Sequence, residues 1–266
     1  MNRYHTLELT RPRPGVLLVA LNRPERLNAI SFEMFDELLA LQADINAKDD
    51  IRVVVITGNG RGFCAGLDLD DAATLPDMTT TEMMAGQETW AAAIVGFRRL
   101  AAPVIAAVNG ASAGAGMGLA LAADIRIASE SAKFNAAFVK VGLSGGDVGS
   151  SWTLPRLVGL GRATEMSLTG RFVHAEEALR IGLVTEVTPA ETLLTRAYDT
   201  ADLIASNSPF GMALTKQVLQ DNVDAPSLQA AVNVENRNQV LAASTSDMRE
   251  ALSAFREKRM PTFTGS

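Results

Sequence analysis

Short, fully apolar runs separated by stretches of helical periodicity are the feature that most constrains the fold of this chain. Residues 16–21, 53–56 and 104–108 contain only apolar side chains. Strands of this kind are buried on both faces, as in parallel sheets covered by helices. Residues 31–45 and 80–100 instead place apolar side chains three and four positions apart, which is typical of helices. The alternation predicts an α/β fold with a largely parallel sheet.

The last third of the sequence has a different character. From about Glu191 onward the pattern is helical only, with breaks at residues 207–209 and 225–226. We therefore expect residues 1–200 to form the core that carries the site. Residues 201–266 are expected to form a helical region used for subunit contacts.

Composition excludes several classes of protein. The chain is 47% apolar and 20% charged, which supports a large folded core rather than disorder. Its net charge of -6 argues against a nucleic-acid-binding surface, which needs a concentrated basic face. Cys64 is the one cysteine, and His5 and His174 are the two histidines, so neither an internal disulfide nor a metal site is expected.

Two segments were considered as a secretory signal or a membrane span, and neither fits. Residues 1–10 have no apolar run of the kind found in a secretory signal. Residues 100–123 are uncharged and long enough for a membrane span, but Pro103, Asn109 and Ser112 interrupt them. Together with the single cysteine, this predicts a cytoplasmic protein without a membrane partner.

Glycine-rich turns allow three interpretations. Gly58, Gly60 and Gly62 follow a strand, but a dinucleotide fingerprint needs its third glycine one residue later and a helix immediately after it, so a tight turn is favoured. Residues 110–114 and 142–146 both match Gly-x-Ser-x-Gly. A hydrolase with Ser112 as nucleophile would need His174 as its base, yet His174 stands where a helix begins, so this remains the weaker alternative.

The third interpretation uses the turns as backbone donors. Residues 63–69 follow the second strand, and residues 111–118 follow the third strand and open a helix. Turns at the ends of neighbouring parallel strands can each direct one peptide N–H toward the same point, and a helix N-terminus adds its dipole. Such an arrangement is an oxyanion hole.

Several of these segments resemble one known family. The resemblance to the enoyl-CoA hydratase/isomerase (crotonase) superfamily covers nearly the whole chain and is carried by residues 22–24, 27–29, 63–69, 103–110, 123–128, 175–184 and 255–263. It implies a spiral of ββα units with a helical C-terminal trimerisation region, assembled as a trimer or a dimer of trimers. It also implies an acyl-CoA thioester as substrate, with no separate cofactor because coenzyme A is part of the substrate.

The resemblance also implies roles for particular residues. The N–H groups of Leu67 and Ala115 would hold the thioester oxygen, each contributing roughly 3–4 kcal/mol to catalysis. Coenzyme A would lie along four residues in or before the first turn, namely Arg26, Ala65, Asp68 and Leu69. For Asp68 a structural role, in which its side chain binds nearby backbone amides, is an equal alternative.

The chain departs from the hydratases of this family at two positions. Their two catalytic glutamates correspond to Gly118 and Phe138 here, so hydration by a pair of glutamates is not expected. Phe138 is interpreted either as an aromatic wall of the acyl site or as a core residue. Counted back from Pro155, Asp147 matches an aspartate that dienoyl-CoA isomerases use for proton transfer. Counted forward from Gly142 it comes one residue late, which indicates an insertion.

The predicted function depends on the role of Asp147, for which there are several hypotheses. As a proton shuttle it suits double-bond isomerisation, particularly if Phe138 and Trp152 shield it from water. The same aspartate matches the nucleophile of 4-chlorobenzoyl-CoA dehalogenase, so a dehalogenase or thioester hydrolase is the second hypothesis. A scaffold that binds acyl-CoA without catalysis is the third. Asp147 could also be a helix cap, unless Ser150 or Ser151 caps that helix instead.

Overall fold

A six-stranded sheet forms the centre of the computed structural model, which describes residues 3–266; residues 1 and 2 of the N-terminal segment considered above lie outside it. Its strands are, in spatial order, β1 (Leu7–Arg13), β2 (Val16–Leu21), β3 (Val53–Gly58), β5 (Val104–Val108), β7 (Ile125–Ser129) and β10 (Glu186–Thr188). All neighbouring pairs are parallel except β1 and β2. The prediction of a largely parallel α/β sheet is confirmed.

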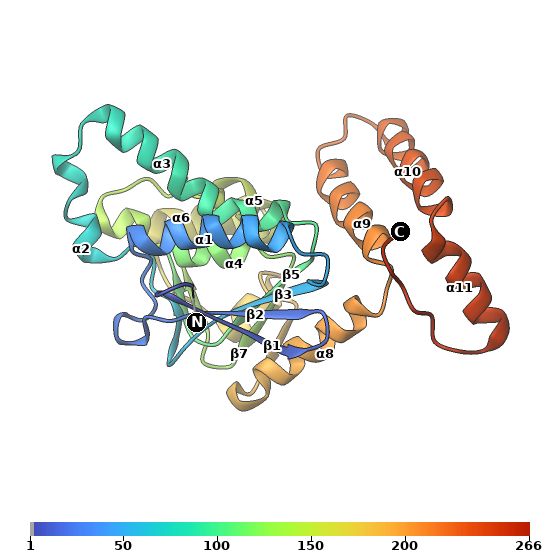
Figure 1. The fold of residues 1–266 in the computed structure, drawn as a ribbon. Coiled ribbons are helices and arrows are strands. Elements are labelled where there is room, and N and C mark those ends of the chain that lie inside the picture. Colours follow the sequence, from blue (N-terminus) through green and yellow to red (C-terminus); the bar gives the residue numbers. More distant parts are fainter. Residues whose placement is uncertain (1–2) are drawn as a thin grey trace.

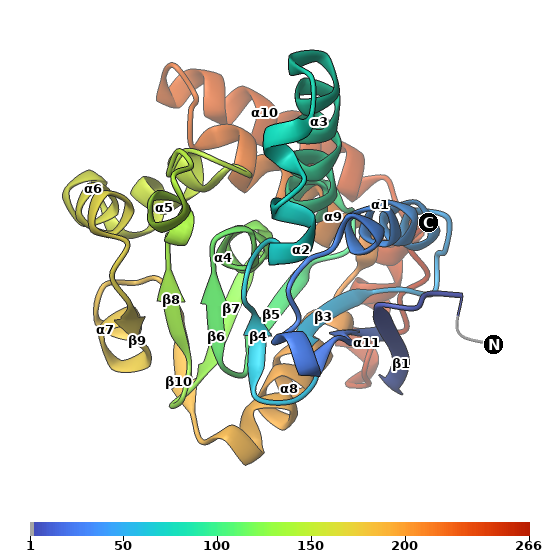
Figure 2. The ribbon, with the colours of Figure 1, turned by 90° about the vertical axis from the view of Figure 1, so that its left-hand side faces the viewer.

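A second, smaller sheet runs beside the first (Figure 2). It contains β4 (Gly62–Cys64), β6 (Ala111–Ala113), β8 (Lys133–Asn135) and β9 (Val173–His174). The pairs β3–β4, β5–β6 and β7–β8 each give one strand to each sheet before the chain enters a helical segment. Three ββα units therefore follow one another as turns of a spiral.

Helices cover both faces of the large sheet (Figure 1). One face packs against α1 (Phe32–Asn46), α3 (Thr80–Val95) and α4 (Ala115–Ala122), and the other against α8 (Leu193–Ala205). Alternate side chains of β3 point to opposite faces of the sheet. Val54 and Ile56 belong to the main core, and Val53 and Val55 pack toward α8. This double burial explains why the strands are apolar throughout.

The other helices of the core are short. They are α2 (Leu69–Ala72), α5 (Ser150–Val158), α6 (Leu160–Thr169), α7 (Ala175–Arg180) and the 3-10 turns Pro24–Arg26, Leu75–Asp77, Gly96–Arg99, Ala137–Val141 and Ala190–Thr192. Ser31 caps α1 by accepting a hydrogen bond from the Met34 N–H, as its position predicts. The helix expected over residues 80–100 ends at Val95 and continues as a 3-10 turn.

The C-terminal helices α9 (Pro209–Asn222), α10 (Leu228–Ala243) and α11 (Ser246–Glu257) project away from the core (Figure 1). Large apolar side chains on them face solvent, including Leu228, Val240 and Phe255. By contrast α8, which contains residue 200, packs on the large sheet, so the core continues to Ala205. The use of the projecting helices for subunit contacts stays a prediction.

The uncharged segment 100–123 divides among three elements. It supplies β5, β6 and the whole of α4, and α4 is only eight residues long. Within residues 3–266, no helix combines the length and the apolar character that crossing a membrane requires.

Candidate active site

A cavity of about 320 Å³ lies where the turns after β4 and β6 meet α3 and the loop before α5. Figure 2 shows β4 and β6 side by side, with α2 and α3 above them. Most of the side chains that line the cavity are apolar, including Phe35, Leu75, Met83, Trp90, Phe138, Val141 and Leu143. The cavity is lined by the predicted oxyanion-hole residues Leu67 and Ala115, the predicted wall Phe138 and the predicted acid–base residue Asp147. Gly118 does not line it.

Leu67 presents a free amide because of how its neighbours bond. The Ile30 N–H donates to the Gly66 carbonyl at 2.7 Å, and the Asp68 N–H donates to the Ile30 carbonyl at 2.9 Å. In such a parallel bridge the N–H of the middle residue points away from the partner strand. The Leu67 N–H thus has no acceptor in the part of the chain that the structure describes.

Ala115 presents a second free amide at the first position of α4. The first N–H groups of a helix have no acceptor within that helix, and Ala115 has none elsewhere among residues 3–266. The two turns touch, because a Cβ atom on Gly66 would lie 3.7 Å from the Ala115 nitrogen. Gly66 (φ +101°) and Gly114 (φ +51°) give these turns conformations that glycine adopts readily.

Asp147 lies in a loop that contains several glycines and faces the same cavity. Its Oδ1 accepts hydrogen bonds from the Val148 N–H at 2.8 Å and from the Gln87 side chain of α3. Helix α5 begins at Ser150 with Gly149 as its N-cap, and no side chain in the described chain caps it. The cap interpretation of Asp147 and that of Ser150 or Ser151 are therefore wrong.

The structure excludes two of the glycine-turn interpretations. Ser112 is fully buried and its hydroxyl donates to the Gly116 carbonyl at 3.2 Å, whereas His174 is exposed on β9 and does not line the cavity. The Ser112 hydrolase is therefore wrong. Gly62 begins strand β4 rather than a helix, and Gly60 has φ +77°, so this segment is a tight turn and no dinucleotide fingerprint.

Comparison with known proteins identifies the family. The model of the enoyl-CoA hydratase/isomerase family matches residues 11–266. The chain belongs to this family. It is 43% identical over 258 residues to a probable enoyl-CoA hydratase of Mycobacterium bovis, covering 95% of this chain and 90% of the relative.

Two further relatives agree with this assignment. The 1,2-epoxyphenylacetyl-CoA isomerase of Escherichia coli K12 is 41% identical over 260 residues, covering 97% of this chain and 98% of the relative. The crystal structure of a putative enoyl-CoA hydratase from Streptomyces coelicolor A3(2) superposes with a TM-score of 0.94 at 38% identity, covering 100% of this chain and 96% of that one. The crotonase-like fold expected from the sequence is confirmed, and the chain is an enoyl-CoA hydratase/isomerase family enzyme that acts on acyl-CoA.

Gly118 and Phe138, the two positions predicted to stand where hydratases carry their glutamates, have apolar surroundings. Gly118 lies within α4, and Val148 covers it: a Cβ atom on Gly118 would lie 2.4 Å from Cγ2 of Val148. Val148 itself has φ +41°, a rare conformation for a β-branched residue. Phe138 is buried in a 3-10 turn and lines the cavity, so it is both a core residue and a wall.

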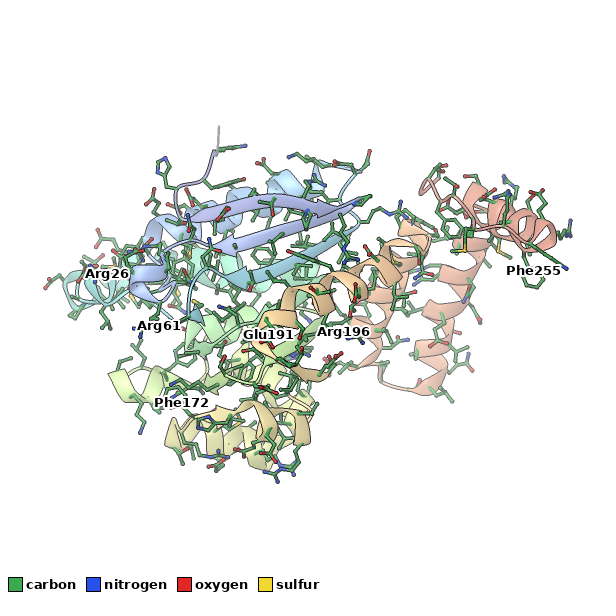
Figure 3. The ribbon with its side chains drawn as sticks, turned by 90° about the horizontal axis from the view of Figure 1, so that it is seen from below. Arg26, Arg61, Phe172, Glu191, Arg196 and Phe255 are labelled. Atoms are coloured by element: carbon green, nitrogen blue, oxygen red, sulfur yellow. The ribbon has the colours of Figure 1, made fainter. Side chains whose placement is uncertain are left out.

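Of the residues expected along coenzyme A, some line the cavity and Arg26 lies on the exposed surface. Ala65 and Leu69 line the cavity, and Leu69 is 73% exposed at its edge. Arg26 is exposed and pairs with Asp70 at 2.8 Å. Figure 3 shows Arg26 and Arg61 at the same end of the molecule, opposite Phe255.

Asp68 has a defined structural role. Its Oδ2 accepts from Arg23 at 2.7 Å, and its Oδ1 accepts from the Asp70 N–H at 2.9 Å, which caps α2. Burial opposes ionisation, but the hydrogen bonds from the Asp70 N–H and Arg23, together with the Arg23 charge, hold the pKa of Asp68 below its usual value. Both carboxylate oxygens are engaged within the protein, and a contact with coenzyme A stays a prediction.

Gln87 and Val148 were missed by sequence reasoning, and Trp90 was assigned only to a helix. Met83, Gln87 and Trp90 lie four and three positions apart and so share one face of α3, which is the available signal for their common position. Trp90 stacks on Phe32 with ring centroids 4.8 Å apart. Trp152, which was expected to shield Asp147, instead makes cation–π contacts with Arg98 and Arg156 and does not line the cavity.

Two other features contain polar groups but lie outside this cavity. His5, Glu33 and Glu37 bring ligand atoms within 4.8 Å of one another, yet Glu37 already accepts hydrogen bonds from the His5 and Thr6 N–H groups. A larger, open hollow of about 940 Å³ separates the core from α9 and α10. It is crossed by an ion pair between Lys216 and Asp124 at 2.8 Å.

Proposed function

We propose that this enzyme isomerises the double bond of an enoyl-CoA thioester. The amides of Leu67 and Ala115 hold the thioester oxygen, and the carboxylate of Asp147 moves one proton between two carbon atoms. One observation carries the proposal: within residues 3–266, Asp147 is the single ionisable side chain that lines the cavity. A reaction that needs one acid–base group suits this site best.

The proposed reaction conserves atoms and charge. The Asp147 carboxylate removes a proton from the carbon next to the double bond, and the electron pair delocalises onto the thioester oxygen as a dienolate. The two N–H groups stabilise that negative charge, each by roughly 3–4 kcal/mol. The carboxylic acid then returns the same proton to the other end of the dienolate, which shifts the double bond and restores the carboxylate.

Hydration and hydrolysis each require a group that this cavity lacks. Addition of water in the manner of the two-glutamate hydratases needs a second acid–base residue, and the corresponding positions hold Gly118 and Phe138. A covalent ester on Asp147 would need another base to activate the water that cleaves it. In the described chain no histidine, lysine or second carboxylate lines the cavity. Isomerisation is therefore favoured over the dehalogenase or hydrolase hypothesis.

Substrate binding and assembly complete the proposal. Coenzyme A lies along Arg26, Ala65, Asp68 and Leu69, and the acyl group enters the apolar part of the cavity beside Phe138. Because one relative is named a 1,2-epoxyphenylacetyl-CoA isomerase, ring-bearing acyl groups belong in the substrate panel. The exposed apolar side chains of α9–α11 support self-assembly, for which we propose a trimer or a dimer of trimers. We also propose that the enzyme is cytoplasmic and needs no separate cofactor.

The proposal is tested with Asp147→Asn on a panel of 2-enoyl-, 3-enoyl- and arylacetyl-CoA esters. We expect kcat for isomerisation to fall by about 10²–10⁴-fold. Asp221→Asn, at an exposed site on α9, is the matched control and should keep full activity. Product positions are read by NMR in deuterated water. Turnover by Asp147→Asn at the wild-type rate on every active substrate would overturn the proposal.

A further inference from the structure

We propose that Gln87 is a positioning residue that fixes Asp147 and selects Oδ2 as the oxygen that moves the proton. The inference rests on the proposed function, because it assigns how the proposed base is held. Gln87 lies on α3, 60 residues before Asp147, and its side-chain amide donates to Asp147 Oδ1. Both residues line the cavity.

The two oxygens of the Asp147 carboxylate have different surroundings. Oδ1 accepts from Gln87 Nε2 and from the Val148 N–H, so both of its donors are fixed within the protein. Across residues 3–266, no donor approaches Oδ2. An oxygen that already accepts two hydrogen bonds is poorly placed to take a proton from carbon. Oδ2 is therefore the oxygen available to the substrate.

Gln87 belongs to a helix that is anchored at both ends, whereas Asp147 lies in a glycine-rich loop. Helix α3 begins with a capping box between Thr79 and Glu82, and near its end the Ala93 carbonyl accepts from Gln42 at 2.7 Å. The segment 142–149 contains four glycines and joins a 3-10 turn to α5. Glycine-rich backbone has many accessible conformations in the absence of tertiary contacts. The hydrogen bond from Gln87 thus ties a glycine-rich loop to an anchored helix.

The chemical type of Gln87 suits this role. A carboxamide does not titrate in the working range, so it can hold a carboxylate without competing for the proton that is transferred. A carboxylic acid at the same position would share a proton with Asp147, because two adjacent carboxylates do not both ionise readily. Replacing the amide by a carboxylic acid should therefore change how kcat depends on pH, which a purely structural role of Gln87 would not predict.

The test compares Gln87→Met and Gln87→Glu, both of similar length to glutamine, with Gln217→Met as a control at an exposed site on α9. For Gln87→Met we expect kcat to fall about 10–100-fold with KM within about threefold, since misplacement by 1 Å can cost about 10²-fold. For Gln87→Glu we expect low kcat at neutral pH and recovery as pH falls. At low pH the glutamate is protonated and can donate to Asp147 Oδ1, as Gln87 does. No other titratable group in the described chain lines the cavity, so the change in kcat reports this pair.

The outcomes separate this inference from the function on which it rests. If Asp147→Asn is inactive while Gln87→Met and Gln87→Glu both keep the wild-type kcat and pH profile, the positioning role is wrong and the proposed function stands. If Asp147→Asn is fully active, the proposed function is wrong whatever Gln87 does. Should Gln87→Met fold poorly, the pH profile of Gln87→Glu decides: recovery in acid supports the inference, and a profile parallel to wild type overturns it.

Discussion

A Cβ atom on Gly118 would lie 2.4 Å from Cγ2 of Val148, well inside van der Waals contact. Val148 is buried and has φ +41°, so the loop before α5 places a β-branched side chain directly over α4. The space that a glutamate side chain on α4 would need is therefore filled. The shape of this loop, and not only the residue type at position 118, therefore opposes a carboxylate here.

We predict that Gly118→Glu does not produce a hydratase. The new side chain must displace Val148, and overpacking of this kind costs about 1–3 kcal/mol of unfolding free energy. Urea unfolding measures the loss, and the decrease in enoyl-thioester absorbance measures hydration. Adding Val148→Gly should recover part of the stability, because the two changes share one space. Efficient hydration by Gly118→Glu alone would contradict this account.

Gly66→Ala should damage turnover more than stability. The new Cβ atom would lie 2.9 Å from the Ala113 carbonyl oxygen, at a residue with φ +101°, and so would separate the turns that carry the Leu67 and Ala115 amides. Loss of one aligned donor costs about 10²–10³-fold in kcat. Gly161→Ala is the matched control, since it meets no atom within 4 Å in α6 and should be neutral or slightly stabilising. Equal kcat for the two variants would contradict the prediction.

The two tryptophans should report differently on binding. Trp90 lines the cavity and stacks on Phe32, whereas Trp152 lies outside it in contact with two arginines. We expect an acyl-CoA substrate analogue to change the intrinsic fluorescence of the wild type and of Trp152→Phe. The change should be absent in Trp90→Phe. Titrations of the three proteins with the same ligand check this, and a signal that follows Trp152 would place the acyl group elsewhere.

Asp68 should make stability depend on pH in the acid range. Its pKa is lower in the folded chain than in the unfolded one, so its contribution is complete above about pH 4 and declines as the pH falls through the folded-state pKa. We expect Asp68→Asn to cost about 2 kcal/mol near neutrality, because it breaks the partly buried, charged hydrogen bond with Arg23. This difference should shrink toward pH 3.

The control for Asp68 is Asp70→Asn, which breaks an exposed pair with Arg26 and should cost about 0–1 kcal/mol. Urea unfolding of all three proteins between about pH 3 and pH 7 gives both comparisons. A constant difference between wild type and Asp68→Asn over that range would show that the carboxylate charge contributes nothing.

Local pattern was enough to predict most of the core. Strands β2, β3 and β5 and the capped helix α1 were all predicted. A strand buried on both faces is a run of apolar residues, and a capped helix begins after a residue such as serine, so both can be recognised from neighbouring residues. Strand β1 was not expected: it pairs at the edge of the sheet, and its sequence, LELTRPR, alternates and is partly polar. The short strands of the second sheet were missed because three residues carry almost no periodic signal.

The sequence by itself determined the fold class and the family, since these depend on residue types in order along the chain. It also identified Leu67, Ala115 and Asp147 as candidates. Only the tertiary structure decided that Val148 fills the space above Gly118, that Trp152 lies away from Asp147 and that Gln87 holds Oδ1. The contact of Val148 with Gly118 and that of Gln87 with Asp147 join residues 30 and 60 positions apart, and the first also rests on the positive φ of Val148. Tertiary packing determines these contacts, and no local sequence pattern predicts them.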